Sequence, residues 1–75
     1  MKHTLTLINR YLLQNDLFND VSYIGGNNTQ CQIKMSVNSD LYRFIEKMKK
    51  YTKCRISLRL HKATDEGTIT FRRYK

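Results

Sequence analysis

Apolar and polar residues alternate strictly in two stretches of the chain, residues 30–37 and residues 54–61. Successive side chains of a β-strand point to opposite faces of a sheet, so an alternating stretch is typical of a strand with one buried face and one face in water. The alternation therefore predicts two strands. It also determines which side chains of each strand face solvent.

A stretch with helical periodicity precedes each of these strands. Residues 4–18 place Leu5, Ile8 and Leu12 along one side of a helix, and residues 41–51 form a second, narrower apolar stripe. The Asn-Ser-Asp sequence at residues 38–40 predicts that the second helix begins at an N-cap, either the asparagine or the serine.

Two turns complete the secondary structure. Residues 21–24 are short and β-prone, and the Gly-Gly-Asn-Asn sequence at residues 25–28 predicts a hairpin turn with positive φ angles. A second turn at residues 63–67 leads into a strand at residues 68–74. The register of the first strand stays open, because either alternate pair within residues 21–24 could face the core.

These elements predict an α+β fold of order αββαββ. We expect a four-stranded, mostly antiparallel sheet with two helices packed on one face and the other face open to solvent. Residues 1–75 form a single domain of two helix–hairpin halves, 1–37 and 38–75. The predicted core consists of Leu5, Ile8, Leu12, Ile33, Met35, Val37, Leu41, Ile45, Met48, Ile56, Leu58, Leu60, Ile69 and Phe71.

The whole net charge of +8 lies in the second half of the chain. Residues 1–42 carry three basic and three acidic side chains, whereas residues 43–75 carry eleven basic and three acidic ones. Clustered cations attract polyanions. Nucleic acid is the commonest partner of such a surface.

Alternation also predicts where these charges lie. If the apolar side chains of the strands face the helices, the arginines, hydroxyls and amides between them gather on the open face. Arginine binds phosphate through two donors and stacks on bases, and tyrosine offers a further stacking surface. We predict a nucleic-acid-binding surface, with phosphate contacts from a lysine-rich helix, formed by Lys34, Lys47, Lys50, Lys53, Arg55, Arg59, His61, Arg72 and Tyr74.

The expected ligand is RNA or DNA, with RNA favoured because a broad open sheet is a platform for single-stranded RNA. We predict no catalytic residue, cofactor or metal site. Cys31 and Cys54 share the parity of buried neighbours, and with His3 and His61 they make no zinc-ligand spacing. A signal peptide and a membrane span are both absent from the pattern, which predicts a cytoplasmic protein, or a host-cytoplasmic one if the source is viral.

A different function remains open: a small phage- or plasmid-type inhibitor that binds a protein partner through the basic surface. Leu13 and Leu17 lie outside the apolar stripe of the first helix. An exposed apolar edge of this kind predicts a homodimer contact or a contact with a partner protein.

The second alternative is a nuclease. The αββαββ order resembles the core of the LAGLIDADG-type homing endonucleases, which would imply a sheet that sits on DNA. The resemblance is in element order alone: residues 14–20 lack the small-residue and acidic motif that the family packs at its helix interface. Asp16 and Asp20 are the available metal ligands there, and acids near a helix end are typical of surface or capping positions.

Overall fold

The computed structural model describes residues 2–73 and confirms the αββαββ order. A single 3-10 turn, η1, is added between the first helix and the first strand. The elements are α1 (Lys2–Gln14), η1 (Phe18–Asp20), β1 (Val21–Gly26), β2 (Gln30–Ser36), α2 (Ser39–Tyr51), β3 (Cys54–His61) and β4 (Glu66–Arg73).

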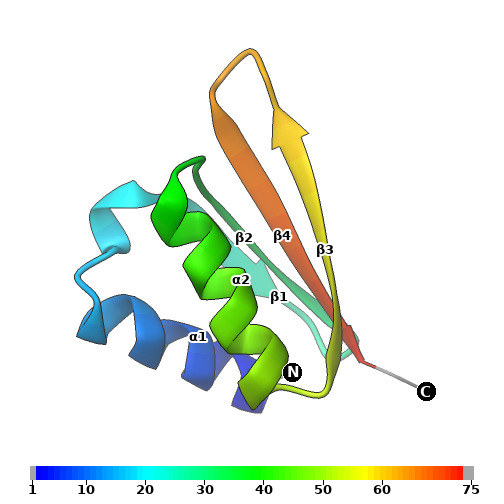
Figure 1. Ribbon diagram of the computed structural model, residues 1–75. Helices are drawn as coiled ribbons and strands as arrows, with labels where there is room; N and C mark the ends of the chain where they lie inside the picture. Colours follow the sequence, from blue (N-terminus) through cyan, green and yellow to red (C-terminus); the bar gives the residue numbers. More distant parts are fainter. Residues whose placement is uncertain (1, 74–75) are drawn as a thin grey trace.

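The four strands form one open sheet in the order β1-β2-β4-β3, in which every neighbouring pair is antiparallel. The last strand therefore inserts beside β2, and β1 and β3 become the edges. Figure 1 shows α1 and α2 on the same side of this sheet. None of the described elements covers the opposite side, which we call the open face.

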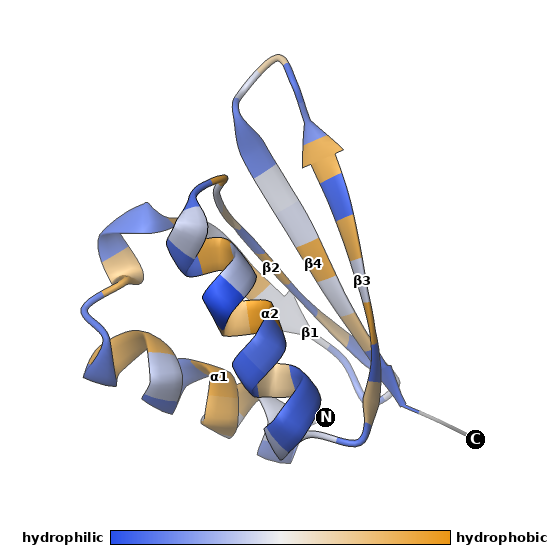
Figure 2. Ribbon diagram, viewed as in Figure 1, coloured by the Kyte–Doolittle hydropathy of each residue, from blue (hydrophilic) through white to orange (hydrophobic). Residues whose placement is uncertain are grey.

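The core lies between the helices and the alternating residues of the sheet. In β2, Cys31, Ile33 and Met35 are fully buried, as the alternation predicts. Figure 2 shows the same alternation of hydrophobic and hydrophilic residues along β3. Phe44 of α2 joins the layers, since its ring centroid lies 5.4 Å from that of Tyr11 and 6.0 Å from that of Phe71.

Both ends of α2 are capped by side chains. Asn38 is the N-cap, and its Oδ1 accepts a hydrogen bond of 3.1 Å from the backbone N–H of Leu41. At the other end, the Thr52 hydroxyl donates to the carbonyl of Met48 over 2.8 Å. The two caps mark the ends of the helix, and the chain enters β3 shortly after the cap at Thr52. Within residues 2–73, no helix is long and apolar enough to cross a bilayer.

Helix α1 ends at Gln14 rather than continuing to residue 18. Asp16 adopts a positive φ of 55°, its N–H donates to the carbonyl of Leu13, and the N–H of Leu17 donates to the carbonyl of Leu12 over 2.9 Å. These two bonds form a Schellman motif, which turns the residue after the left-handed position back onto the helix. Leu17 is consequently buried, with 6% of its surface exposed, so the exposure on which its predicted dimer or partner contact depended was wrong.

Leu60 was also assigned wrongly, as a core residue, and is 52% exposed. The end of the β3–β4 hairpin extends beyond α2 in Figure 1, so no helix covers this position. Leu58, two residues nearer the helix, is half-buried against the core. The alternation correctly predicted the inward face, but the burial of an inward side chain depends on how far the helix reaches.

A β-bulge in β1 overturns both simple registers for this strand. Val21 pairs with Met35, and Tyr23 pairs with Lys34, so Ser22 is the extra residue. A bulge shifts the alternation by one position. Val21 and Ile24 both pack against the core, whereas Tyr23 belongs to the open face together with its cross-strand partner.

The first hairpin turn is also tighter than predicted. Gly25 and Gly26 belong to β1, and neither has a positive φ. The chain reverses instead at residues 27–29. There the N–H of Asn27 donates to the carbonyl of Gln30. The side-chain Oδ1 of Asn27 accepts a hydrogen bond of 2.9 Å from the N–H of Thr29.

Burial of Leu17 leads to a stability prediction. Leu17→Ala should lower the free energy of unfolding by about 2–5 kcal/mol, because it opens a cavity beneath the helix end. Leu13→Ala is the matched control and should change that energy by less than about 0.5 kcal/mol, because Leu13 is 72% exposed. Urea denaturation followed by circular dichroism measures both. Equal losses would contradict the burial of Leu17.

Candidate nucleic-acid interface

The side chains of the open face form rows across the strands, because directly paired residues of antiparallel strands point to the same side. The first basic row consists of Gln30 on β2, Arg72 on β4 and Arg55 on β3. Arg55 and Arg72 are direct cross-strand partners. Like charges in this arrangement repel, so the row raises the positive potential at one end of the face.

The second basic row consists of Lys34 on β2, Thr68 on β4 and Arg59 on β3. Tyr23 on β1 extends it, because Tyr23 pairs with Lys34. The two basic rows lie four residues apart along the strands, roughly 13 Å, with one further row between them. Arginine and lysine side chains of the two rows can therefore reach separate anionic groups along one extended polyanion.

A polar row separates the two basic rows. It consists of Gln32, Thr70 and Ser57, one from each of β2, β4 and β3. The Gln32 side-chain amide donates to the Thr70 hydroxyl over 3.4 Å. Amide and hydroxyl groups at this place offer hydrogen bonds to sugar or phosphate oxygens between the cations.

At the far end of the open face, polar side chains form hydrogen bonds with one another. Glu66 accepts a hydrogen bond of 2.6 Å from the Ser22 hydroxyl, and the ring Nε2 of His61 lies 2.8 Å from the Thr68 hydroxyl. His61 pairs across the strands with Glu66. The structure thus places the predicted His61 on the open face, beside the carboxylate that ends the cationic region.

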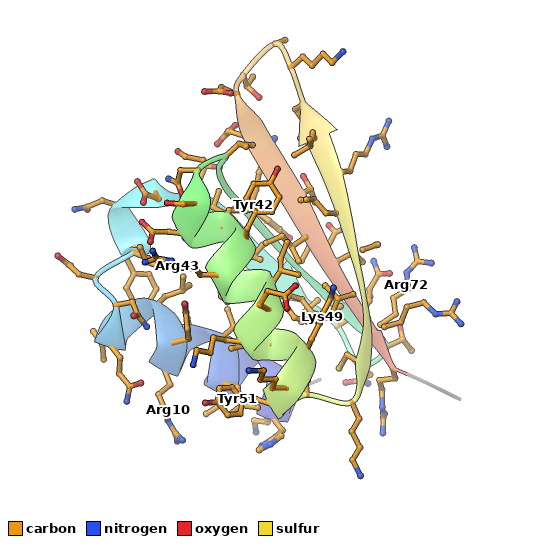
Figure 3. All side chains as sticks on the ribbon, in the orientation of Figure 1. Arg10, Tyr42, Arg43, Lys49, Tyr51 and Arg72 are labelled. Atoms are coloured by element: carbon orange, nitrogen blue, oxygen red, sulfur yellow. The ribbon has the colours of Figure 1, made fainter. Side chains whose placement is uncertain are left out.

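Three cations of the two basic rows, one on each of β2, β3 and β4, are available to a ligand. Within residues 2–73, no hydrogen bond or ion pair engages the side chains of Lys34, Arg59 or Arg72. Arg59 and Arg72 are exposed, and Lys34 is half-buried among its neighbours. Figure 3 shows Arg72 extending from the sheet on the side away from the helices.

The lysines of α2 lie on the helical side, so the predicted binding residues divide into two groups. Lys47 and Lys50 line a shallow depression between α1 and α2, together with Tyr11, Tyr42 and Arg43. Figure 3 shows Arg43 and Tyr51 on this side, opposite Arg72. The structure therefore does not bring these lysines and the sheet arginines onto one surface.

Lys53 lies between the two groups, in the short connection from α2 to β3. Close to it, Lys49 and Arg55 line one shallow depression at the edge of the sheet. Lys49 also forms an exposed ion pair with Glu46, with 3.7 Å between Nζ and Oε1. The predicted Tyr74 lies outside the described residues.

Sequence reasoning missed one functional candidate, Tyr23, which is 53% exposed on the open face. A Cβ added to Gly25 would lie 2.7 Å from the Tyr23 hydroxyl oxygen and 3.1 Å from the adjacent ring carbon. The ring therefore lies along β1 over the glycine. A glycine two residues after a tyrosine in a strand was the available signal.

The environment of Cys31 does not favour nucleophilic chemistry. Both thiols are free, and burial raises the pKa of the Cys31 thiol to about 11, with a smaller contribution from Cys54. Cys54 is half-buried, and its Sγ lies 3.5 Å from the Thr4 hydroxyl. Among the described residues, no group of three or more histidine, cysteine or acidic side chains could hold a metal ion.

Comparison with known proteins adds no assignment: no family model, curated protein or solved structure matches the chain.

The environments of the two thiols predict unequal reactivity. At pH 8, a disulfide reagent should modify Cys54 in the folded protein and leave Cys31 unmodified, because Cys31 is fully buried and remains protonated below pH 9. The Cys54→Ala variant should lose the reactive thiol, and urea should expose the second. Fast labelling of Cys31 in the native protein would contradict the buried position of β2.

Proposed function

We propose that this protein binds nucleic acid, with RNA favoured, through the open face of its sheet and without catalysing a reaction. One observation carries the proposal: two basic rows flank a polar row on a surface that no described element covers. The arginines supply bidentate donors for phosphates. The hydroxyls and amides between them supply neutral donors and acceptors for the sugar.

The shape of the face supports RNA over DNA. A duplex-DNA reader inserts a helix or a two-stranded ribbon into the major groove. Here α2 is packed against the sheet, and the cations spread over three strands of the open face. The polar row also offers Gln32, Thr70 and Ser57 to a 2′-hydroxyl, the group that distinguishes RNA from DNA. A cytoplasmic location, where RNA is present, belongs to the same proposal.

A protein-binding inhibitor remains the second candidate, and the exposure of Leu13 favours it. This leucine is 72% exposed on α1, away from the basic rows. The dimer or partner contact predicted there stays a prediction. Leu13→Asp would abolish self-association detected by light scattering if that contact exists. The nuclease alternative has only the element order in its favour.

Removing charge from either side of the sheet tests the proposed face. The triple variant Arg55→Gln, Arg59→Gln, Arg72→Gln should bind single-stranded RNA at least about tenfold more weakly at low salt, since phosphate contacts are lost. Its plot of log affinity against log salt should flatten by roughly 2. Fluorescence anisotropy with a labelled oligonucleotide at several salt concentrations measures both quantities.

The matched control removes the same charge from the helical side, in the variant Arg43→Gln, Lys47→Gln, Lys50→Gln. At physiological ionic strength it should bind nearly as well as the unmodified protein. Neither variant should have a lower thermal unfolding midpoint, because these side chains are exposed. Equal losses of affinity in the two variants would show that net charge alone attracts RNA. Absence of RNA and DNA binding by the unmodified protein at low salt would overturn the proposal and favour a protein partner.

A further inference from the structure

The ring of Tyr23 is held in an unusual place for an exposed aromatic residue. It is on an edge strand, it is 53% exposed, and it lies over the backbone of Gly25 instead of the core. The bulge at Ser22 puts it on the open face. Without the extra residue, alternation would place Tyr23 on the same side as Val21, toward the helices.

Gly25 explains how the ring is accommodated. Its φ is not positive, so the backbone does not require glycine there. A side chain at position 25 would clash with the tyrosine, because an added Cβ would lie 2.7 Å from the Tyr23 hydroxyl oxygen and 3.1 Å from its Cζ. Glycine at position 25 therefore leaves room for the ring to lie along the strand, with its exposed surface toward solvent.

The cations of the second basic row lie on one side of this ring. Tyr23 is the cross-strand partner of Lys34, which belongs to the second basic row together with Arg59. An aromatic face beside a line of cations is the arrangement by which proteins bind single strands, stacking a base on the ring and holding the backbone with the charges. Bases inside a duplex are stacked on each other and cannot use such a ring.

We propose that Tyr23, lying over Gly25, is a stacking site for one unpaired base, and that the ligand of the open face is therefore single-stranded. Lys34 contacts the phosphate next to that base, and Arg59 contacts the backbone farther along the row. This proposal rests on the proposed function. It adds the class of nucleic acid and the residue that selects it.

The decisive variant is Tyr23→Leu, which keeps an apolar side chain and removes the aromatic face. It should weaken binding to an oligouridine of about twelve nucleotides by about 5- to 150-fold, the value of one base stacked on an aromatic ring. Binding to a duplex RNA of the same length should change less than about twofold. Tyr23→Phe should retain binding, because the ring remains.

Two further variants keep the test specific. Gly25→Ala should weaken binding in the same direction as Tyr23→Leu, because the new methyl group displaces the ring. Tyr51→Leu changes a tyrosine that is 62% exposed on the helical side and should have no effect. Circular dichroism and thermal unfolding verify that each variant is folded.

A ligand without bases isolates the stacking contribution. An abasic oligonucleotide should bind the unmodified protein more weakly than oligouridine, and this difference should nearly vanish in Tyr23→Leu. Oligodeoxythymidine, as a parallel ligand, separates RNA preference from stacking.

The outcomes separate the two proposals. Binding that is strong and salt-dependent, but equally affected by Tyr23→Leu for single strands, duplexes and abasic chains, would overturn the stacking site and leave the basic face intact. A failure of the unmodified protein to bind any of these ligands would overturn the proposed function itself.

Discussion

Burial of one face of β2 and β4 against the two helices is the constraint on which the rest of the structure depends. Ile33 and its direct partner Ile69 are fully buried, and Phe44 brings the helices onto the same layer through its contact with Phe71. In a strand, one buried residue fixes the side of all the others. Once these side chains face the helices, Lys34, Thr68 and Arg72 have to face away.

This arrangement places positive charges next to each other on the open face, where their repulsion does not stabilise the fold. Arg55 and Arg72 face each other on neighbouring strands, and like charges at that distance reduce the stability of a sheet. A domain of 75 residues has a small stability reserve. If the open face binds a polyanion as proposed, an anion beside these arginines would offset their repulsion and stabilise the β3–β4 pair.

The sequence predicted the elements and the open face correctly because both follow from local periodicity. The alternation at residues 54–61 assigns Arg55 and Arg59 to one side whatever the strand order. The strand order itself depends on which edge β4 pairs with, and only this order makes Gln30, Arg72 and Arg55 neighbours. Periodicity contains no information about that choice.

The remaining errors have local physical causes that a periodic pattern averages out. Leu17 became a core residue because a single left-handed residue, Asp16, reverses the chain beneath α1. Tyr23 reached the open face because one extra residue interrupts the alternation of β1. In both cases one backbone irregularity moved a large side chain to the opposite side, and in the second case it created the candidate stacking site.

The two groups of cations cannot contribute equally to one bound strand. The shortest dimension of the domain is 19 Å, and the Debye length at physiological ionic strength is about 8 Å. Charges on the helical side, such as Lys47 and Lys50, are therefore largely screened from a ligand on the open face. They would add a general attraction for the proposed polyanion at low salt, when screening is weak. At physiological salt, the orientation of the ligand has to come from side chains that contact it directly, those of the two basic rows and Tyr23.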